Sequence, residues 1–230
     1  MPVLNPKDIS EVMHGDREIG ALFAGDKLMY NKRHLVEYLN AGTYKFLVPR
    51  WANYVSVITK GGGGGGSAGS YYTEKGGEGG GISTKRILFR DSNIRYAINL
   101  TVGAGGRGGQ STGSKGQDGE ASSWRYNEDI SDRAGGGAGG ASSTQNGGEG
   151  YGYNKLSAAQ AAHLLREEGS RYFPSVAGTG NGGHGRYGGG GAGGKGDLRA
   201  GWGKGGNGGD GFVSICCWGV DPTLPRLGVA

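Results

Sequence analysis

The chain is poor in the residues that build a conventional core and in those that cross-link a small one. Only 34% of its 230 residues are hydrophobic, which argues against a large apolar core. Its two cysteines, Cys216 and Cys217, are adjacent. Neighbouring side chains of a strand point to opposite faces, so a disulfide between them would be strained. We therefore expect no disulfide framework, which suits a protein assembled in a reducing cytosol.

Other absences exclude further classes of protein. Six prolines are too few for collagen, which needs proline between its regularly spaced glycines. No apolar run is long enough to span a membrane, and the first residues lack the pattern of a signal peptide. The net charge is +5, but lysine and arginine are scattered among acidic residues. No nucleic-acid partner is predicted from that balance.

Residues suited to catalysis or metal binding are also sparse. None of the four histidines (His14, His34, His163 and His184) has the spacing of a zinc ligand or neighbours a nucleophile motif. The stretch "GAGGRGGQ" at residues 103–110 is similar to a dinucleotide-binding loop, but no strand–helix unit with a following acidic residue accompanies it. We predict that the protein is not an enzyme and has no cofactor and no metal site.

What the chain has instead is glycine, 55 residues of it, much of it with a period of three. In "GKGGNGGDG", only Lys204, Asn207 and Asp210 carry side chains. Similar tracts occur at residues 103–110, 135–141, 180–185 and 188–196. This period fits neither the α-helix nor the strand, but it fits the extended left-handed helix with three residues per turn, here called polyglycine II.

A polyglycine II helix makes no internal hydrogen bonds, so its backbone groups must find partners on neighbouring chains. We predict a bundle of such helices, in which bare glycine edges pack together and the polar edge faces solvent. The all-glycine tract at residues 61–66 is expected to lie inside the bundle. A flexible linker is the alternative interpretation of the same composition.

Segments of ordinary composition flank and interrupt the tracts, and their alternating apolar residues predict strands. We expect strands near residues 43–59, 82–102 and 212–217, the second being a pair joined by a turn at residues 91–93. A helix is predicted from Leu156 to Glu168, since Ser157 and Gln160 form a capping box. The predicted fold class is mainly β plus a polyglycine II bundle: a β-sheet or sandwich layer with a glycine-rich insert and one short α-helix.

These patterns predict three regions in the chain. Residues 41–217 form the glycine-rich domain, residues 1–40 an N-terminal attachment region and residues 218–230 a C-terminal tail. In the first region, two short apolar strands are predicted on either side of a turn at Gly25-Asp26. This region is too small to hold its own core, so we expect it to dock on something else.

The stretches "GTYKFLVP", "VSVITKGGGGGG", "INLTVGAGGRGG" and "GGNGGDGFVSI" resemble the glycine-rich domain of bacteriophage tail fibres and tail-tip adhesins. The resemblance covers roughly residues 42–217, and "ALFAGDKLMYN" is similar to a short N-terminal hairpin of phage tail proteins. It implies a sandwich of polyglycine II helices whose distal loops bind bacterial surface receptors. The glycine-rich fold in the ligand-binding region of the anaplastic lymphoma kinase receptors is also similar, but the extracellular cysteine framework is missing here.

Binding residues are predicted in the inserts between tracts, where aromatics gather beside Arg, Asp or Asn. Such residues dominate binding hot spots and suit sugar rings. The predicted receptor contacts are Tyr71, Tyr72, Trp124, Arg125, Tyr126, Arg171, Tyr172, Phe173, His184, Tyr187 and Trp202. The cluster of Trp124, Arg125 and Tyr126 is the first choice. The alternative is that these aromatics close the ends of the bundle.

The expected function is that of a phage tail-fibre or tail-tip protein that binds a receptor on the host bacterium. The expected partners are a host cell-surface receptor, either an outer-membrane protein or a glycan, and another tail protein that contacts the N-terminal region. A homotrimer is left open. The expected location is the virion tail, after assembly in the host cytoplasm. The alternative is a purely structural tail or baseplate component without direct receptor contact.

Overall fold

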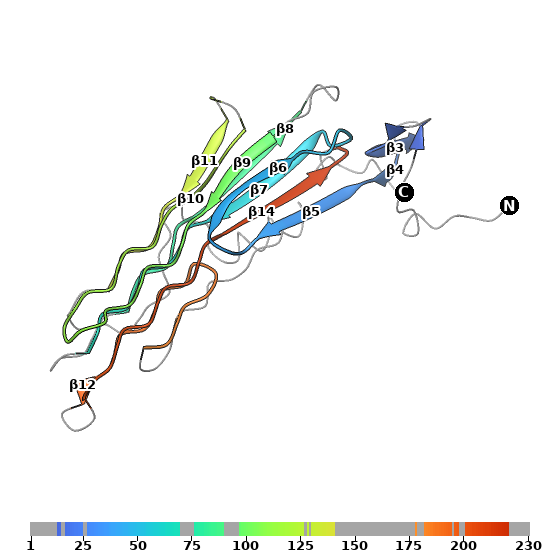
Figure 1. The fold of residues 1–230 in the computed structure, drawn as a ribbon. Coiled ribbons are helices and arrows are strands. Elements are labelled where there is room, and N and C mark those ends of the chain that lie inside the picture. Colours follow the sequence, from blue (N-terminus) through green and yellow to red (C-terminus); the bar gives the residue numbers. More distant parts are fainter. Residues whose placement is uncertain are drawn as a thin grey trace.

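The computed structural model describes residues 13–14, 17–24, 27–69, 76–89, 97–126, 128, 130–140, 178, 182–194, 196–197 and 201–220. At one end of the molecule lie two four-stranded antiparallel sheets, and extended glycine-rich runs lead away from them (Figure 1). Within the described residues no helix is long and apolar enough to cross a bilayer.

The two sheets form a sandwich. One has the order β5 (Arg33–Tyr38), β14 (Phe212–Trp218), β7 (Tyr54–Lys60) and β8 (Ile82–Leu88). The other has the order β11 (Ser131–Ala134), β10 (Ser122–Arg125), β9 (Ala97–Val102) and β6 (Gly42–Leu47). Three two-stranded sheets complete the described elements: β1 (Met13–His14) with β2 (Arg17–Glu18), β3 (Ala21–Ala24) with β4 (Lys27–Asn31), and β12 (Gly196–Asp197) with β13 (Gly201–Trp202).

A single apolar cluster fills the space between the two sheets. Alternate residues of β7 and β14, such as Val55, Val57 and Ile215, meet Leu100 of β9 and Trp124 of β10. Period-two alternation puts these side chains on one face of each strand. The small hydrophobic fraction of the sequence is thus concentrated where the sheets face one another.

The predicted fold class needs correction, because the described structure is all-β. Its elements are strands joined by turns and extended runs, and it contains no α-helix in the part of the chain that is described. The segment Leu156–Glu168, on which the helix was predicted, lies outside the described residues. The mainly β part of the prediction agrees with the structure, and so does the predicted hairpin around Gly25-Asp26, which is β3 and β4.

Residues 82–102 do not form a hairpin, although the turn signal predicted one. β8 pairs with β7 in the first sheet, whereas β9 pairs with β6 and β10 in the second. The connection between β8 and β9 therefore crosses from one sheet to the other. Ile87 of β8 and Ile98 and Leu100 of β9 are all buried in the core between the sheets, so the sandwich buries the apolar residues of both strands without a hairpin.

The glycine-rich runs form a lattice of backbone hydrogen bonds around one central run, residues 61–69. Successive N–H groups of Gly61, Gly62 and Gly63 donate to three different neighbours, and Gly64 returns to the first of them. This is the periodicity of a three-residue turn. Every residue of the central run is buried.

Six outer runs enclose the central run. Its N–H groups donate to residues 76–81, 114–120 and 203–209, and its carbonyls accept from residues 103–109, 135–140 and 188–194. Each outer run also bonds to the two beside it, so the ring closes. Glycine is required because the neighbours are so close: a Cβ at Gly64 would lie 2.0 Å from the carbonyl oxygen of Ala138.

Polar side chains along the runs also complete the lattice at its edge, while Lys204 and Asn207 are exposed to solvent as predicted. The N–H of Gly108 donates to Asn207 Oδ1, and that of Gly105 donates to Asp210 Oδ1, both over 2.9 Å. Asp118 Oδ1 accepts in the same way from Gly139. These oxygens take the place of a carbonyl from an absent neighbouring run.

The first segment of the chain is attached to the far end of the sandwich. β5 is an edge strand of the first sheet and pairs with β14 throughout, although it lies inside the region predicted for attachment. Before it, Lys32 donates its N–H to Gly20 and accepts one from Gly219, which fastens the β3–β4 hairpin to the end of β14. The described sandwich therefore begins at Arg33, and the part left for attachment is shorter than predicted.

Both cysteines of β14 are free and buried. Cys217 faces the core between the sheets, and its neighbour Cys216 points to the other face. Burial raises the pKa of both thiols, and at Cys216 the nearby Arg33 opposes part of that rise. Thiols with raised pKa values react slowly, so these two side chains serve the packing of the strand.

A buried lysine lies where β7 enters the central run. Lys60 is 4% exposed, and its aliphatic stem packs against Gly188, whose added Cβ would lie 2.9 Å from Lys60 Cγ. Desolvation lowers the pKa of Lys60 from 10.5 to about 8. The unfolded chain therefore holds this proton between pH 8 and 10.5 while the folded chain releases it, so its contribution to stability rises with pH in that window.

Lys60→Met is expected to stabilise the protein at pH 7, because it removes the cost of burying the ammonium. The gain in free energy of unfolding has an upper bound of about 3 kcal/mol, which is the free energy equivalent to the lowering of the Lys60 pKa. Urea unfolding at pH 7, 9 and 10 measures it, and the gain should shrink as pH rises. Lys45→Met, at an exposed lysine, is the control and should change little. A loss of stability in Lys60→Met at pH 7 would contradict the assignment.

Candidate binding site at the tip of the bundle

The glycine-rich runs reverse direction at the end of the bundle remote from the sheets, here called the bundle tip. Gly69 donates its N–H to Gly203 over 2.7 Å and accepts one from Gly113, while Gly194 donates to Ser67. Residues 111–113 form the turn between two outer runs, and β12 and β13 lie beyond residues 188–194 (Figure 1). The tip therefore brings together parts of the chain that are far apart in sequence.

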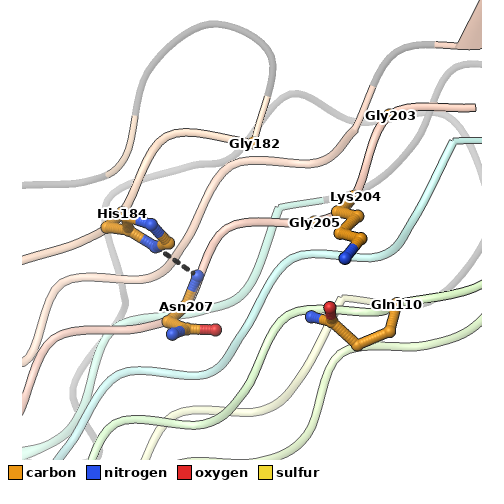
Figure 2. Close-up of a pocket in the computed structure, with 7 residues that line it drawn as sticks. All are labelled: Gln110, Gly182, His184, Gly203, Lys204, Gly205 and Asn207. Carbon is orange, nitrogen blue, oxygen red and sulfur yellow. Dashed lines mark hydrogen bonds between the residues drawn. The ribbon is translucent and has the colours of Figure 1, made fainter.

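A groove of about 440 Å³ lies beside these reversals, lined by Gln110, Gly182, His184, Gly203, Lys204, Gly205 and Asn207 (Figure 2). We call it the tip groove. Gly182 has a φ of +66°, in the left-handed region, and a Cβ there would lie 2.4 Å from the carbonyl oxygen of Lys204. The floor of the groove is thus backbone, and its side chains come from three different segments.

The tip groove offers hydrogen-bonding groups of several kinds. His184 Nδ1 accepts the N–H of Asn207 over 2.9 Å, which leaves Nε2 as the donor of the neutral ring. Gln110 Nε2 donates to the carbonyl of Gly108, which leaves its amide oxygen as an acceptor. Lys204 is exposed and adds a positive charge. A polar ligand could contact all three side chains together.

The predicted receptor contacts that the structure describes do not gather in one place. His184 lines the tip groove, but Tyr187 lies in a turn at the base of the bundle, where it packs on the buried cluster of Ile58, Ile82 and Phe212. There it closes the junction between bundle and sheet, which is the alternative role considered for the aromatics. Trp202 belongs to β13 near the tip, but its side chain is not described. Tyr71, Tyr72, Arg171, Tyr172 and Phe173 lie outside the described residues.

The first-choice cluster lies in the sandwich instead. Trp124 belongs to β10, is 2% exposed and packs in the core, so its side chain is not accessible to a receptor in this structure. Tyr126 packs edge-on against Phe89, with ring centroids 5.3 Å apart. Only Arg125 of the three is exposed. Ser, Arg and Asp make up most of β10 and β11, so the sequence of this insert does not show the alternation typical of strands.

Sequence reasoning missed Gln110 and Lys204 as groove residues. A lysine at every-third spacing in a glycine tract is typical of a solvated edge, and nothing in the sequence shows which tracts become neighbours. Residues 182–185 bond to the outer runs at residues 188–194 and 203–209 from outside the ring, and this placement brings His184 to the groove. Among the described residues, no three or more His, Cys, Asp and Glu side chains are grouped so as to hold a metal ion.

The architecture defines the class of protein: an antiparallel β-sandwich extended by a hydrogen-bonded bundle of glycine runs. The comparison with protein families agrees with this description. The chain belongs to the glycine-rich domain family, whose model matches residues 39–218 and so includes every strand of both main sheets except β5. No curated protein matches the chain in sequence.

Proposed function

We propose that the protein is a bacteriophage tail-fibre or tail-tip component that binds a receptor on the host bacterium through the bundle tip. The observation that carries the proposal is the closed ring of outer runs around residues 61–69. Runs bonded on every side form a stiff support, and reversals held at one end of a stiff support are a common basis for recognition. The virion tail is the location that goes with this function.

The composition of the segments near the tip supports the same proposal. Residues 70–75 connect Gly69 to Gly76, which are the ends of two neighbouring runs, and they contain Tyr71 and Tyr72. Together with His184 and Lys204 of the tip groove, they combine aromatic, hydroxyl and cationic groups. Side chains of these types recognise both protein surfaces and glycans.

The opposite end of the molecule suits attachment to another tail protein. The β3–β4 hairpin carries Leu22 and Phe23, which are 41% and 49% exposed. It is fastened beyond the sandwich, away from the bundle tip (Figure 1). Exposed apolar side chains on an element this small favour burial against a partner.

The receptor proposal predicts that Tyr71→Ala and Tyr72→Ala weaken binding to host cells without lowering the melting temperature. Truncating an aromatic anchor typically costs about 2 kcal/mol or more, or roughly thirtyfold in affinity. The measurement uses the labelled full chain and flow cytometry on a panel of bacterial strains, with surface-polysaccharide and outer-membrane-protein mutants of any strain that binds.

The matched control is Arg50→Ala, an exposed residue at the sandwich end, which should bind like the unaltered chain. Binding to no strain of the panel would contradict receptor recognition and favour a structural tail component. Equal losses in the tip variants and in Arg50→Ala would show that binding does not depend on the tip.

A further inference from the structure

The outward face of the sheet β11-β10-β9-β6 is polar and hollowed. Its inward residues, such as Leu100 and Trp124, are buried in the core, so the alternate residues of each strand face away from the sandwich. On that side lies a depression of about 460 Å³, within the size range of ligand sites. We call this surface the outer face.

Strand register sets two rows of side chains on the outer face. In one row, Lys45 pairs with Asn99, Asn99 with Arg125, and Arg125 with Ser131. In the other row, Thr101 and Ser123 separate Thr43 from Arg133. Arg125 and Arg133 are thus diagonal neighbours on adjacent strands, about 7–8 Å apart. Lys45 lies two strands from Arg125, about 10 Å away.

Cations outnumber carboxylates on the outer face. Lys45, Arg125 and Arg133 are all exposed. Asp132 is the only acidic residue in these four strands. It accepts a hydrogen bond from Ser83 of the facing sheet and another from the backbone N–H of Arg133. Asp132 also lines the depression, so the three cations face one carboxylate of these strands and leave an excess of positive charge.

Hydroxyl and amide groups fill the space between the cations. Thr101 and Ser123 can both donate and accept, and Asn99 offers an amide, as sugar hydroxyls require. Arginine matches a carboxylate with two parallel hydrogen bonds. Among the described residues that these four strands turn outward, none has an aromatic ring to stack a base, since Trp124 is buried and Tyr126 packs on Phe89. Such stacking is a principal contact of proteins that bind single-stranded nucleic acids.

We propose that the outer face binds an acidic polysaccharide, with Arg125 and Arg133 holding sugar carboxylates and the hydroxyl and amide side chains contacting the neutral positions. The site is separate from the bundle tip. It would place a sugar-binding surface on the side of the molecule, and it does not depend on the function proposed for the tip.

The test measures the affinity of the full chain for a hexamer of galacturonic acid by calorimetry at low ionic strength. The neutral galactose hexamer and single-stranded DNA of similar charge are the comparison probes. The acidic hexamer should bind, and rising salt should weaken it. Arg125→Ala and Arg133→Ala should each lower its affinity about tenfold or more, as loss of a charged hydrogen bond does. Arg50→Ala is the control for net charge.

The melting temperatures of both variants should stay unchanged, because the side chains are exposed. No binding of the acidic hexamer, or equal binding of the neutral one, overturns the proposal. An equal loss of affinity in Arg50→Ala would show that binding depends on net charge alone, which also overturns the proposal. Tighter binding of DNA would assign the face to nucleic acid instead.

Discussion

Gly64→Ala is expected to destabilise the protein by about 3 kcal/mol or more, as overpacking of a tight interior does. The added methyl group would lie 2.0 Å from the carbonyl oxygen of Ala138 and 2.4 Å from its carbon. That carbonyl accepts the N–H of Glu78, and Gly64 itself donates to the carbonyl of Glu78. Moving the run of Ala138 away would therefore weaken hydrogen bonds among the three runs that contain Gly64, Glu78 and Ala138. The melting temperature should fall by roughly 10 °C.

Gly135→Ala is the matched control within the same lattice. Gly135 is exposed, and a Cβ at this position meets nothing within 4 Å. Removing a glycine where the methyl group fits should stabilise by about 0.5 kcal/mol, through the lower entropy of the unfolded chain. Urea unfolding of both variants gives the comparison. Similar stabilities for the two variants would mean that the central run is not enclosed as described.

Trp124→Ala is expected to cost about 3–5 kcal/mol of stability, the usual loss for a large aromatic removed from a core. The side chain is 2% exposed and lies in the cluster that joins the two sheets. Its indole Nε1 has no hydrogen-bond partner within the described part of the chain. Trp124→Phe should therefore cost much less, because it keeps most of the ring volume and removes a buried donor without a partner.

Arg125→Ala serves as the control for this comparison, since Arg125 is the next residue on the same strand and is exposed. Its effect on stability should stay within about 0.5 kcal/mol. Thermal unfolding of Trp124→Ala, Trp124→Phe and Arg125→Ala measures these differences in stability. An unchanged melting temperature in Trp124→Ala would show that the side chain is not packed in the core. Trp124 would then again be a candidate receptor contact.

The sequence predicted the parts of the fold that depend on local pattern. The segments around residues 54–60 and 212–218 either alternate apolar with polar residues or are mostly apolar, which predicts strands. They form β7 and β14 in the structure. The spacing of Lys204, Asn207 and Asp210 indicated a three-residue turn, and the hydrogen bonds of the lattice return with that period.

The parts that depend on which segments become neighbours were not predictable. β8 and β9 look like a hairpin in sequence, and only the sandwich shows that they belong to different sheets. Glycine tracts have no side chains to specify a partner, so their order around residues 61–69 could not be inferred. The candidate site could not be inferred for the same reason: His184 and Lys204 come from separate segments that line one groove, while the Trp124 segment is a core strand.

The three-residue turn also limits how a chain of this design can change in length. Adding one residue to an outer run rotates everything beyond it by a third of a turn, so each N–H group would point at the wrong neighbour. Three added residues restore the phase but extend that run past its partners, so a longer bundle needs the same increment in every run of the ring. A turn such as residues 111–113 has no such constraint. Insertions and deletions should accordingly come in steps of three along the bundle and in any number at its reversals.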